Sequence, residues 1–415
     1  MLNTISTTTT SNKNKTSSMT TSFPFLILIY SIITINTQEQ QQQTKTLPQN
    51  YADSPLIDPK KSEIHIFKKF EEFKTRFNKN YTTFEENAER FEIFKQNYLT
   101  MLSYRDKNTG SDVLGITEYM DIPQRQFLRI YFRNPVVIPK DSDNEGEVWN
   151  ETIPQVLNLQ DFDGQGELYY ETEQSKKEST TDTDIDEAEL QIQEQTMQLR
   201  NLQMIPNVYD WRTQGVVSSV KDQGLCGGCW SFAALVAVEG AYARKYKKLY
   251  SFSPQQIIDC NQYNYGCSGG TIAAALSYLK SYPAQPLSSY PYKQYRQTCK
   301  YNYKLGIAKV SSYYYSSSSN EENIKAMLYN GGPLAININA TPLQYYKGGI
   351  FNPTTCSNSV NHGVALVGYG YSNGVPYWIV KNSWGSNWGE GGYFRIYRGK
   401  KLCGMTSTVI AAKVV

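Results

Sequence analysis

Residues 223–230 read Gln-Gly-Leu-Cys-Gly-Gly-Cys-Trp and place Cys229 at the start of an apolar segment, 229–246, that predicts a buried helix. A thiol has a reference pKa of about 8.5 and is mostly protonated near neutral pH. Because the N-terminus of a helix carries partial positive charge, it stabilises the thiolate at this position. The segment therefore suits a nucleophilic cysteine, although Cys226-x-x-Cys229 is also a pattern of redox sites and zinc sites.

The chain has 415 residues, and all 7 of its cysteines lie after residue 225. An odd number in an exported protein indicates disulfides plus one free thiol, and the spacing leaves open which cysteine is free. Export is predicted by residues 1–37, where an apolar run from Phe23 to Ile35 follows a polar start. The run is shorter than the ~20 residues of a membrane span and is typical of a signal peptide. An uncleaved anchor is the alternative, and no other stretch predicts a stable membrane span.

The chain contains two histidines, His65 and His362. His65 falls in a predicted amphipathic helix outside the cysteine-rich region, so a histidine base would have to be His362. So few imidazoles argue against a His-ligated zinc site, and a zinc ribbon would need a second Cys-x-x-Cys pair. A thioredoxin-like site would need a surrounding βαβ pattern, which we do not find. We therefore expect no metal and no cofactor.

The region before residue 205 divides into three parts after the signal peptide. Residues 38–61 are Gln-rich and contain three prolines, which predicts a disordered linker. Residues 62–128 predict a small helical domain of two amphipathic helices, followed by an extended piece at 113–119. Residues 129–204 predict an acidic linker with a helical end around 188–202. The apolar positions are Ile66, Phe70, Phe73 and Phe77 on the first helix and Ala88, Phe91, Phe94, Tyr98 and Met101 on the second.

Charge is unevenly distributed along the chain. Residues 205–415 hold 20 Lys+Arg and 7 Asp+Glu, a net charge of +13, whereas residues 141–200 are acidic. Such asymmetry can indicate binding to an anionic polymer, but no nucleic-acid motif accompanies it, so we expect no nucleic-acid partner. Our hypothesis is that the acidic segment lies against the basic domain, and that acid or salt weakens this attraction. A solubilising spacer is the alternative.

Residues 205–415 predict a helical half followed by a sheet half, which is an α+β architecture. Trp, Gly and Cys become frequent from Ile205 onwards. Helices are expected at 229–246, 254–260 and 271–279, and strands at 334–338, 363–369, 377–380 and 393–397. The Tyr- and Ser-rich tract at 313–319 predicts the end of a strand and a loop.

Three blocks within 205–415 resemble the active-site blocks of the papain/cathepsin L family of cysteine proteases, in that family's order. They are Gln223-Gly-x-Cys226-Gly-x-Cys229-Trp230, Asn361-His362-Gly-Val and Lys381-Asn382-Ser-Trp384-Gly-x-x-Trp388-Gly. His362 and Asn382 follow Cys229 by about 130–150 residues, as the family signature expects. The resemblance implies a papain-like, two-lobed catalytic domain with a helical lobe and a β-sheet or barrel lobe.

The upstream helices resemble the inhibitory prosegment of cathepsin L-like precursors. Glu86-x3-Arg90-x3-Phe94-x2-Asn97 is similar to the first part of that prosegment's helical signature, and Gly115-Ile-Thr-Glu-Tyr119-Met-Asp121 is similar to the strand that follows it. The resemblance implies a zymogen in which the chain's own prosegment is an intramolecular inhibitor. Met101 and Arg105 replace the usual Ile and Asn and leave the inhibitory strength open.

The resemblance also implies a role for each matching residue. Cys229 is the nucleophile, His362 is the general acid and base, and Asn382 orients the imidazole. Gln223 is an oxyanion-hole donor, and Trp384 shields the bond between His362 and Asn382. The implied disulfides are Cys226–Cys267, Cys260–Cys299 and Cys356–Cys403, which leaves Cys229 free.

Substrate contacts follow from the same resemblance. Gly269 and Gly270 pair with the substrate backbone as an added strand. Ile272, Asn337, Val360 and Thr408 surround the pocket for the residue second from the cut, which indicates an apolar preference, although Asn337 leaves the exact choice open. No loop insertion with extra histidines is present in 205–415, which favours an endopeptidase over an exopeptidase.

The expected function is a cysteine endopeptidase that is made as a zymogen, cleaves proteins and peptides, is monomeric and is open to cystatin-like inhibitors. Its expected location is the secretory pathway, in a lysosome- or vacuole-like compartment or outside the cell. Two alternatives stay open, a catalytically inactive papain-fold binding protein and a thiol–disulfide oxidoreductase that uses Cys226 and Cys229. Sequons at Asn80, Asn150 and Asn339 predict glycosylation in that pathway.

Overall fold

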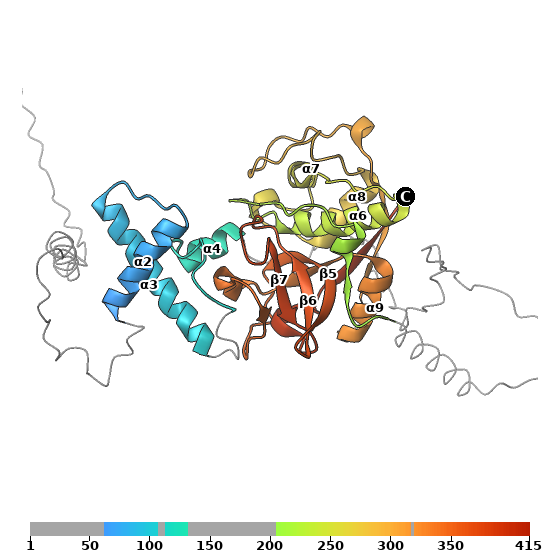
Figure 1. The fold of residues 1–415 in the computed structure, drawn as a ribbon. Helices are drawn as coiled ribbons and strands as arrows, with labels where there is room; N and C mark the ends of the chain where they lie inside the picture. Colours follow the sequence, from blue (N-terminus) through green and yellow to red (C-terminus); the bar gives the residue numbers. More distant parts are fainter. Residues whose placement is uncertain (1–61, 107–112, 132–204, 317–318) are drawn as a thin grey trace, which may run out of the picture.

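The computed structural model describes residues 62–106, 113–131, 205–316 and 319–415 (Figure 1). The predicted signal peptide, the Gln-rich linker, the acidic segment at 141–200 and the helical end at 188–202 lie outside these residues. Within the described part of the chain, no helix combines the length and the apolar character needed to cross a membrane.

The described residues form a helical prodomain followed by a mixed catalytic domain. The helices are α2 (Glu63–Arg76), α3 (Phe84–Asp106), α4 (Gln124–Tyr131), α6 (Cys229–Tyr246), α7 (Pro254–Cys260), α8 (Ile272–Ser281) and α9 (Glu321–Gly331). The 3-10 turns are η4 (Trp211–Gln214), η5 (Gly266–Ser268), η6 (Tyr303–Leu305), η7 (Thr341–Tyr345) and η8 (Leu402–Gly404). The strands are β1 (Tyr209–Asp210), β2 (Val310–Tyr315), β3 (Leu334–Ile338), β4 (Ile350–Phe351), β5 (His362–Ser372), β6 (Val375–Lys381), β7 (Tyr393–Tyr397) and β8 (Val409–Val414).

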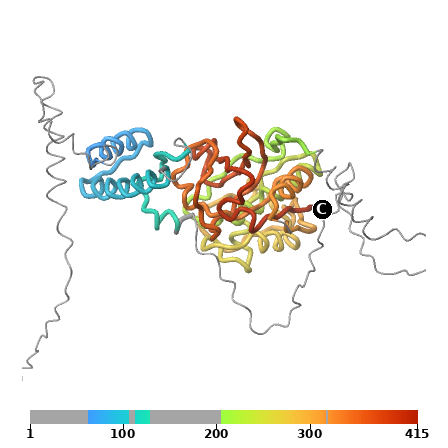
Figure 2. The backbone as a smooth tube through the Cα atoms, turned by 90° about the horizontal axis from the view of Figure 1, so that it is seen from below, coloured from blue at the N-terminus to red at the C-terminus, as the bar shows by residue number. Residues whose placement is uncertain are grey.

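The prodomain is held together by aromatic side chains from the two predicted amphipathic faces. Phe70 on α2 is fully buried, and its ring centroid lies 5.4 Å from those of both Phe91 and Phe94 on α3. Such large apolar groups pack the two helices together as they leave water. Figures 1 and 2 both show α2 and α3 side by side at one end of the molecule, with the catalytic domain at the other.

The segment after α3 joins the prodomain to the catalytic domain. Leu114 pairs with Tyr346 as a single antiparallel bridge, so the predicted extended piece makes one step of sheet pairing. The helix α4 then extends from Gln124 to Tyr131. Helix α4 was not predicted, and it extends across the predicted boundary between residues 128 and 129.

The catalytic domain is built as helices against one mixed sheet, in agreement with the predicted α+β class. The strand order is β2-β8-β3-β5-β6-β7-β4, and β1 adds to β5. The long strand β5 pairs antiparallel with both β3 and β6 and so lies in the middle of the sheet. Figure 1 shows α6 running between this sheet and the helical lobe that contains α7 and α8.

The predicted helices and strands of this domain are present, and several others were missed. The strands β1, β4 and β8 and the helix α9 were not predicted, and β5 extends three residues beyond the expected end. Strand β8 was missed because its Ala411 and Ala412 lack strong β-propensity, yet it joins β2 to β3 in the sheet. Helix α9 begins at a capping residue, Asn320, whose side chain accepts from the amide of Glu322.

The structure contains the three disulfides Cys226–Cys267, Cys260–Cys299 and Cys356–Cys403, and Cys229 is a free cysteine. Two of the predicted glycosylation sites can be placed. Asn80 is exposed, whereas Asn339 is 7% exposed and its Nδ2 donates to the Ser359 carbonyl at 2.7 Å. A buried and bonded amide has no room for a glycan, so the prediction at Asn339 disagrees with the fold.

Candidate active site

The site begins where the helical lobe meets the sheet. Cys229 is the first residue of α6, and His362 is the first residue of β5. Gly363 lies directly against the start of the helix, since a Cβ at this position would come within 3.2 Å of the Cys229 carbonyl oxygen. This close approach favours glycine at position 363, the residue after His362, and brings it against the backbone of Cys229.

The end of β6 holds the imidazole in place. Strand β6 ends at Lys381, and the next residue, Asn382, lies 2.8 Å from His362 through its Oδ1 and the imidazole Nε2. The same Oδ1 accepts from the backbone amide of Ser383 at 2.8 Å, which fixes the carboxamide. His362 and Asn382 are 2% and 4% exposed, so water has little access to the bond between them.

Aromatic rings surround this pair. The Trp384 ring centroid lies 4.9 Å from that of His362 at an interplanar angle of 30°. Trp388 then meets Trp384 edge to face at 4.9 Å. Both indoles are nearly fully buried, so the hydrogen bond between imidazole and carboxamide lies in an apolar environment. A hydrogen bond shielded in this way is electrostatically stronger than one in water.

Gln223 lies on the same side of the site, fully buried. Its Nε2 donates to the Cys226 carbonyl at 3.0 Å, and its Oε1 accepts from the Ser383 hydroxyl at 2.7 Å. The Gln223 backbone amide donates to the Ser383 carbonyl, and Tyr292 Oη donates to the Gln223 carbonyl at 2.7 Å. The sequence analysis missed Ser383 and Tyr292, although Ser383 stands inside a matched block.

Burial sets the protonation of the two reactive groups. It raises the pKa of the Cys229 thiol above its ordinary value, an effect opposed by hydrogen bonds from the backbone amides of Gly363 and Trp230. Burial also lowers the pKa of His362 from 6.5 to about 4, and the bond to Asn382 opposes the shift. In this covered state both groups therefore favour their neutral forms, unlike the thiolate that the sequence suggests for an open site.

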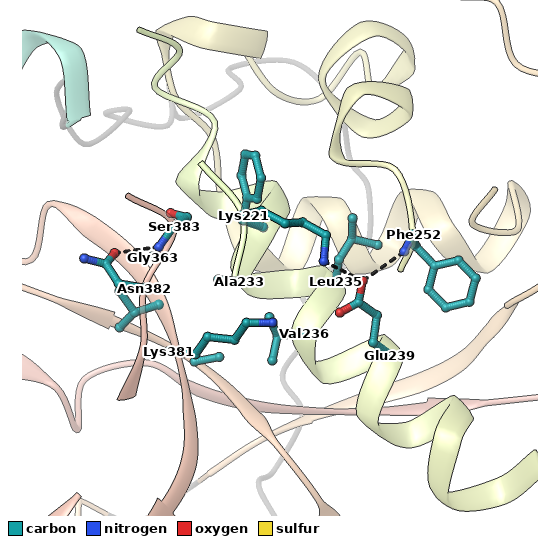
Figure 3. Close-up of a pocket in the computed structure, with 13 residues that line it drawn as sticks. Lys221, Ala233, Leu235, Val236, Glu239, Phe252, Gly363, Lys381, Asn382 and Ser383 are labelled. Carbon is teal, nitrogen blue, oxygen red and sulfur yellow. Dashed lines mark hydrogen bonds and ion pairs between the residues drawn. The ribbon is translucent and has the colours of Figure 1, made fainter. Parts of the chain in front are cut away.

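A buried ionic network lies behind the site, between α6 and the sheet (Figure 3). Lys221 and Lys381 converge with Glu239 on a small pocket, where Lys221 Nζ is 3.5 Å from Glu239 Oε1. Lys381 Nζ donates to the Ser218 carbonyl at 2.7 Å, and the Ser218 hydroxyl donates to Glu239. Burial lowers the pKa of Lys381 from 10.5 to about 8. The network ties the residue before Asn382 to the helix that begins at Cys229.

The predicted substrate-binding residues fall into two groups. Asn337 on β3 is opposite Gly363 in the sheet register, and its amide donates to the Thr408 carbonyl at 3.3 Å, so these two residues lie beside His362. Val360 lies two residues before β5 and is partly exposed. Gly269 and Gly270 follow η5 on the helical lobe, where Gly269 has a φ of 119°. Ile272 is the first residue of α8 and is 1% exposed.

The prosegment covers the site from the side of Trp384. Tyr119 Oη donates to the Trp384 carbonyl at 3.4 Å, and the Phe127 ring centroid lies 5.3 Å from that of Trp384 at 78°. The Phe127 side chain has no exposed surface. Phe127 was not among the predicted functional residues, because it lies on α4, which the sequence analysis also missed.

Hydrogen bonds fix the prosegment against η7. Thr117 Oγ1 donates to the Gln344 carbonyl at 2.6 Å, and Gln344 Nε2 donates back to the Tyr119 carbonyl at 3.1 Å. Asn97 on α3 donates to the Met120 carbonyl at 2.9 Å and accepts from Tyr345 Oη at 3.1 Å. Asn97, part of the quoted helical signature, thus connects α3, the segment that follows it and the catalytic domain.

Comparisons with known proteins agree with this arrangement. Residues 205–413 match the family model of papain family cysteine proteases, and residues 70–127 match that of the cathepsin propeptide inhibitor domain. The chain belongs to the papain family of cysteine proteases and carries that inhibitor domain as its prosegment.

Individual relatives agree with this family assignment. A cathepsin L-like proteinase of Fasciola hepatica is 43% identical over 212 residues, which is 50% of this chain and 65% of that protein. A probable cysteine protease of Arabidopsis thaliana is 33% identical over 384 residues, 88% of this chain and 91% of the relative. The solved structure of digestive procathepsin L 3 from the Tenebrio molitor larval midgut has a TM-score of 0.62 and 32% identity, and the match covers 84% of this chain and 99% of that one. The chain is therefore a cathepsin L-like zymogen.

Proposed function

We propose that this precursor gives rise to an endopeptidase in which Cys229, His362 and Asn382 form the catalytic group. The main support is the 2.8 Å contact between His362 Nε2 and Asn382 Oδ1. Gly363, the residue after His362, lies against Cys229 and so brings the three residues together. Because Asn382 engages Nε2, the other ring nitrogen, Nδ1, is the one that exchanges a proton with the thiol.

The reaction proceeds by acyl transfer. The Cys229 thiol gives its proton to His362, and the thiolate attacks the carbonyl carbon of the scissile bond. The oxyanion accepts hydrogen bonds from the Cys229 amide and from the Gln223 amide hydrogen that does not bond to Cys226. Protonated His362 then donates to the leaving amine, which departs. Neutral His362 finally takes a proton from water as it hydrolyses the thioester.

Ser383 keeps Gln223 ready for this step. Its hydroxyl and carbonyl hold the side-chain oxygen and the backbone amide of Gln223, so the donor amide does not have to reorient when charge develops.

Substrates enter as an extended strand beside Gly269 and Gly270. The side chain second from the cut points toward Asn337, Val360 and Thr408, with Ile272 as the apolar floor. Asn337 lies on the strand that pairs with β5, opposite Gly363, and its amide bonds to Thr408. This position near His362 supports a pocket close to the nucleophile. An apolar side chain of medium size fits this set best.

Exposure to the secretory pathway is part of the proposal. Three disulfides in the described residues are typical of an oxidising compartment, such as the lumen of that pathway or the outside of the cell. Formation of these disulfides in an oxidising environment is consistent with delivery to a lysosome- or vacuole-like compartment and with secretion. We expect the mature enzyme to be monomeric and to bind cystatin-like inhibitors.

A proteolysis assay with two variants tests the proposal. Acid-activated wild-type enzyme should cleave an internally quenched peptide with a medium apolar residue second from the cut, and Cys229→Ala should be inactive. Asn382→Ala should retain a low rate with a displaced pH profile, because the imidazole loses its orientation. Wild-type protein that is processed and correctly disulfide-bonded but cleaves no peptide would instead support the inactive binding protein. A redox role for Cys226 with Cys229 is disfavoured because Cys226 is bonded to Cys267.

A further inference from the structure

A group of cations lies on the loop that follows α8. Lys293, Arg296 and Lys300 are all exposed along this loop, which is bonded to α7. Within the described residues, none of the three forms an ion pair or hydrogen bond through its charged group. Their charge is therefore available to a molecule that approaches this face.

Helix α7 fixes the loop from inside. Gln255 accepts from the Lys293 amide and donates to the Tyr295 carbonyl, each at 2.8 Å. Asp259 accepts from the Gln297 amide at 2.7 Å. The inward-facing polar groups of the backbone are thus satisfied by buried side chains, and the charged side chains point out. The loop presents its cations on a rigid support.

Arg296 reaches the border of the proposed substrate cleft. A Cβ on Gly266 would lie 2.6 Å from Arg296 Cδ, so the arginine stem crosses the backbone at Gly266. Gly266 has a φ of +59° and opens the turn η5, which leads directly to Gly269 and Gly270. The stem of Arg296 therefore lies beside the turn that leads to the segment proposed to pair with the substrate backbone.

A second contact places the same loop beside the oxyanion site. A Cβ on Gly224 would lie 2.1 Å from Gln294 Oε1, and Gly224 follows Gln223. The loop thus borders the cleft along the helical lobe, from Gln223 to the glycine pair.

Acidic groups packed around the loop do not neutralise it. Asp259 is buried at 5% exposure and accepts from Gln255, Gln297 and Tyr290. Asp222 is exposed, and its Oδ1 accepts a hydrogen bond from the Gly224 amide at 2.8 Å.

We propose that Arg296 selects substrates with an acidic side chain at the third or fourth residue before the cut. This inference rests on the proposed function, because it concerns the same cleft. A substrate strand that pairs with Gly269 and Gly270 continues past Gly266, so its upstream side chains come beside the guanidinium. Lys293 adds to the positive potential there.

The expected effect is modest because the arginine is exposed. A solvent-exposed ion pair changes an affinity by about two- to fivefold, and salt screens it. We therefore expect kcat/KM for a peptide with Glu at one of these positions to exceed that for its Gln twin by about threefold at low salt. The ratio should approach 1 at about 0.5 M NaCl.

The test uses acid-activated enzyme prepared from the full-length precursor. Two pairs of internally quenched peptides carry Glu or Gln at the third or the fourth residue before the cut and share all other residues. The Glu-to-Gln ratio of kcat/KM is measured for wild type, Arg296→Gln, Arg296→Lys and Lys248→Gln. Lys248 is an exposed cation just past the end of α6, about 27 Å of helix from Cys229.

The proposal predicts that Arg296→Gln brings the ratio to about 1, and that Arg296→Lys and Lys248→Gln keep it near the wild-type value. A wild-type ratio of 1 at both positions, with both peptides cleaved, would overturn the inference and leave the proposed function intact. An equal loss of the ratio in Lys248→Gln would also overturn it, because net charge would then explain the preference. Failure of the wild type to cleave any peptide would instead contradict the proposed function.

Discussion

Removal of the Phe127 side chain should uncover the active site of the intact precursor. Phe127 is fully buried and packs on Trp384 and Tyr119, each at a centroid distance of 5.3 Å. Replacement of a buried Phe by Ala typically costs about 3–5 kcal/mol. Because Tyr119 belongs to the prosegment itself, we assign about 3 kcal/mol of this to the contact with the catalytic domain. At 1.4 kcal/mol per tenfold, the open form should become ~100-fold more populated.

The assay is covalent labelling of Cys229 in the intact precursor at neutral pH, with an epoxide reagent and sampling before any processing. The labelling rate of Phe127→Ala should exceed that of wild type by ~100-fold. The labelling rate of the mature enzyme sets the upper limit. Phe84→Ala is the control, because Phe84 is a 39% exposed phenylalanine at the start of α3. A folded Phe127→Ala precursor that labels at the wild-type rate would refute the inference that α4 blocks the site.

Three further predictions concern the site itself. The folded precursor should lose stability, by at most about 3 kcal/mol, as the pH falls from 6.5 to 4. In this range the histidine of the unfolded chain binds a proton, whereas buried His362, with its pKa of about 4, does not. Thermal melts of wild type and His362→Gln should differ in this window, and parallel melts would contradict the lowered pKa of His362. Gln223→Ala should lower kcat by about 10²–10³ with a smaller change in KM, measured by steady-state peptide cleavage, and an unchanged kcat would exclude it from the oxyanion hole. Lys381→Ala leaves Glu239 and Ser218 buried without the Lys381 ammonium and should lower the folding stability by about 3 kcal/mol, or roughly 6–12 °C in Tm. Lys309 is exposed, so Lys309→Ala should melt like wild type. Equal melting of the two variants would show that the network is not stabilising.

Local patterns in the sequence were sufficient for the parts of the fold whose periodicity is regular. The phenylalanines at 70, 73, 91 and 94 predicted both prodomain helices, and the predicted bounds of α6 and α7 agree with the structure. Strand β8 and helix α4 were missed. Strand β8 contains Ala411 and Ala412, which lack strong β-propensity, and both elements are stabilised by contacts with segments far away in the chain.

The candidate site shows the same division. Cys229, His362 and Asn382 stand in recognisable blocks, and the structure brings His362 to Asn382 and Gly363 to Cys229. The supports were not predictable, since Tyr292 and Phe127 act through hydrogen bonds and ring packing that only the tertiary fold creates. The neutral state of the reactive pair likewise depends on burial, which the sequence does not give.

Covalent labelling of the active site distinguishes a protease zymogen with Cys229 as nucleophile from an inactive papain-fold protein. The purified precursor is incubated at about pH 4–5 with reductant and an epoxide that alkylates papain-type thiolates, and the labelled peptide is identified by mass spectrometry. The label should be found on Cys229 of a processed fragment that begins near Ile205, and the Cys229→Ala variant should carry no label. Correctly disulfide-bonded protein that takes no label, as precursor or as fragment, would contradict it.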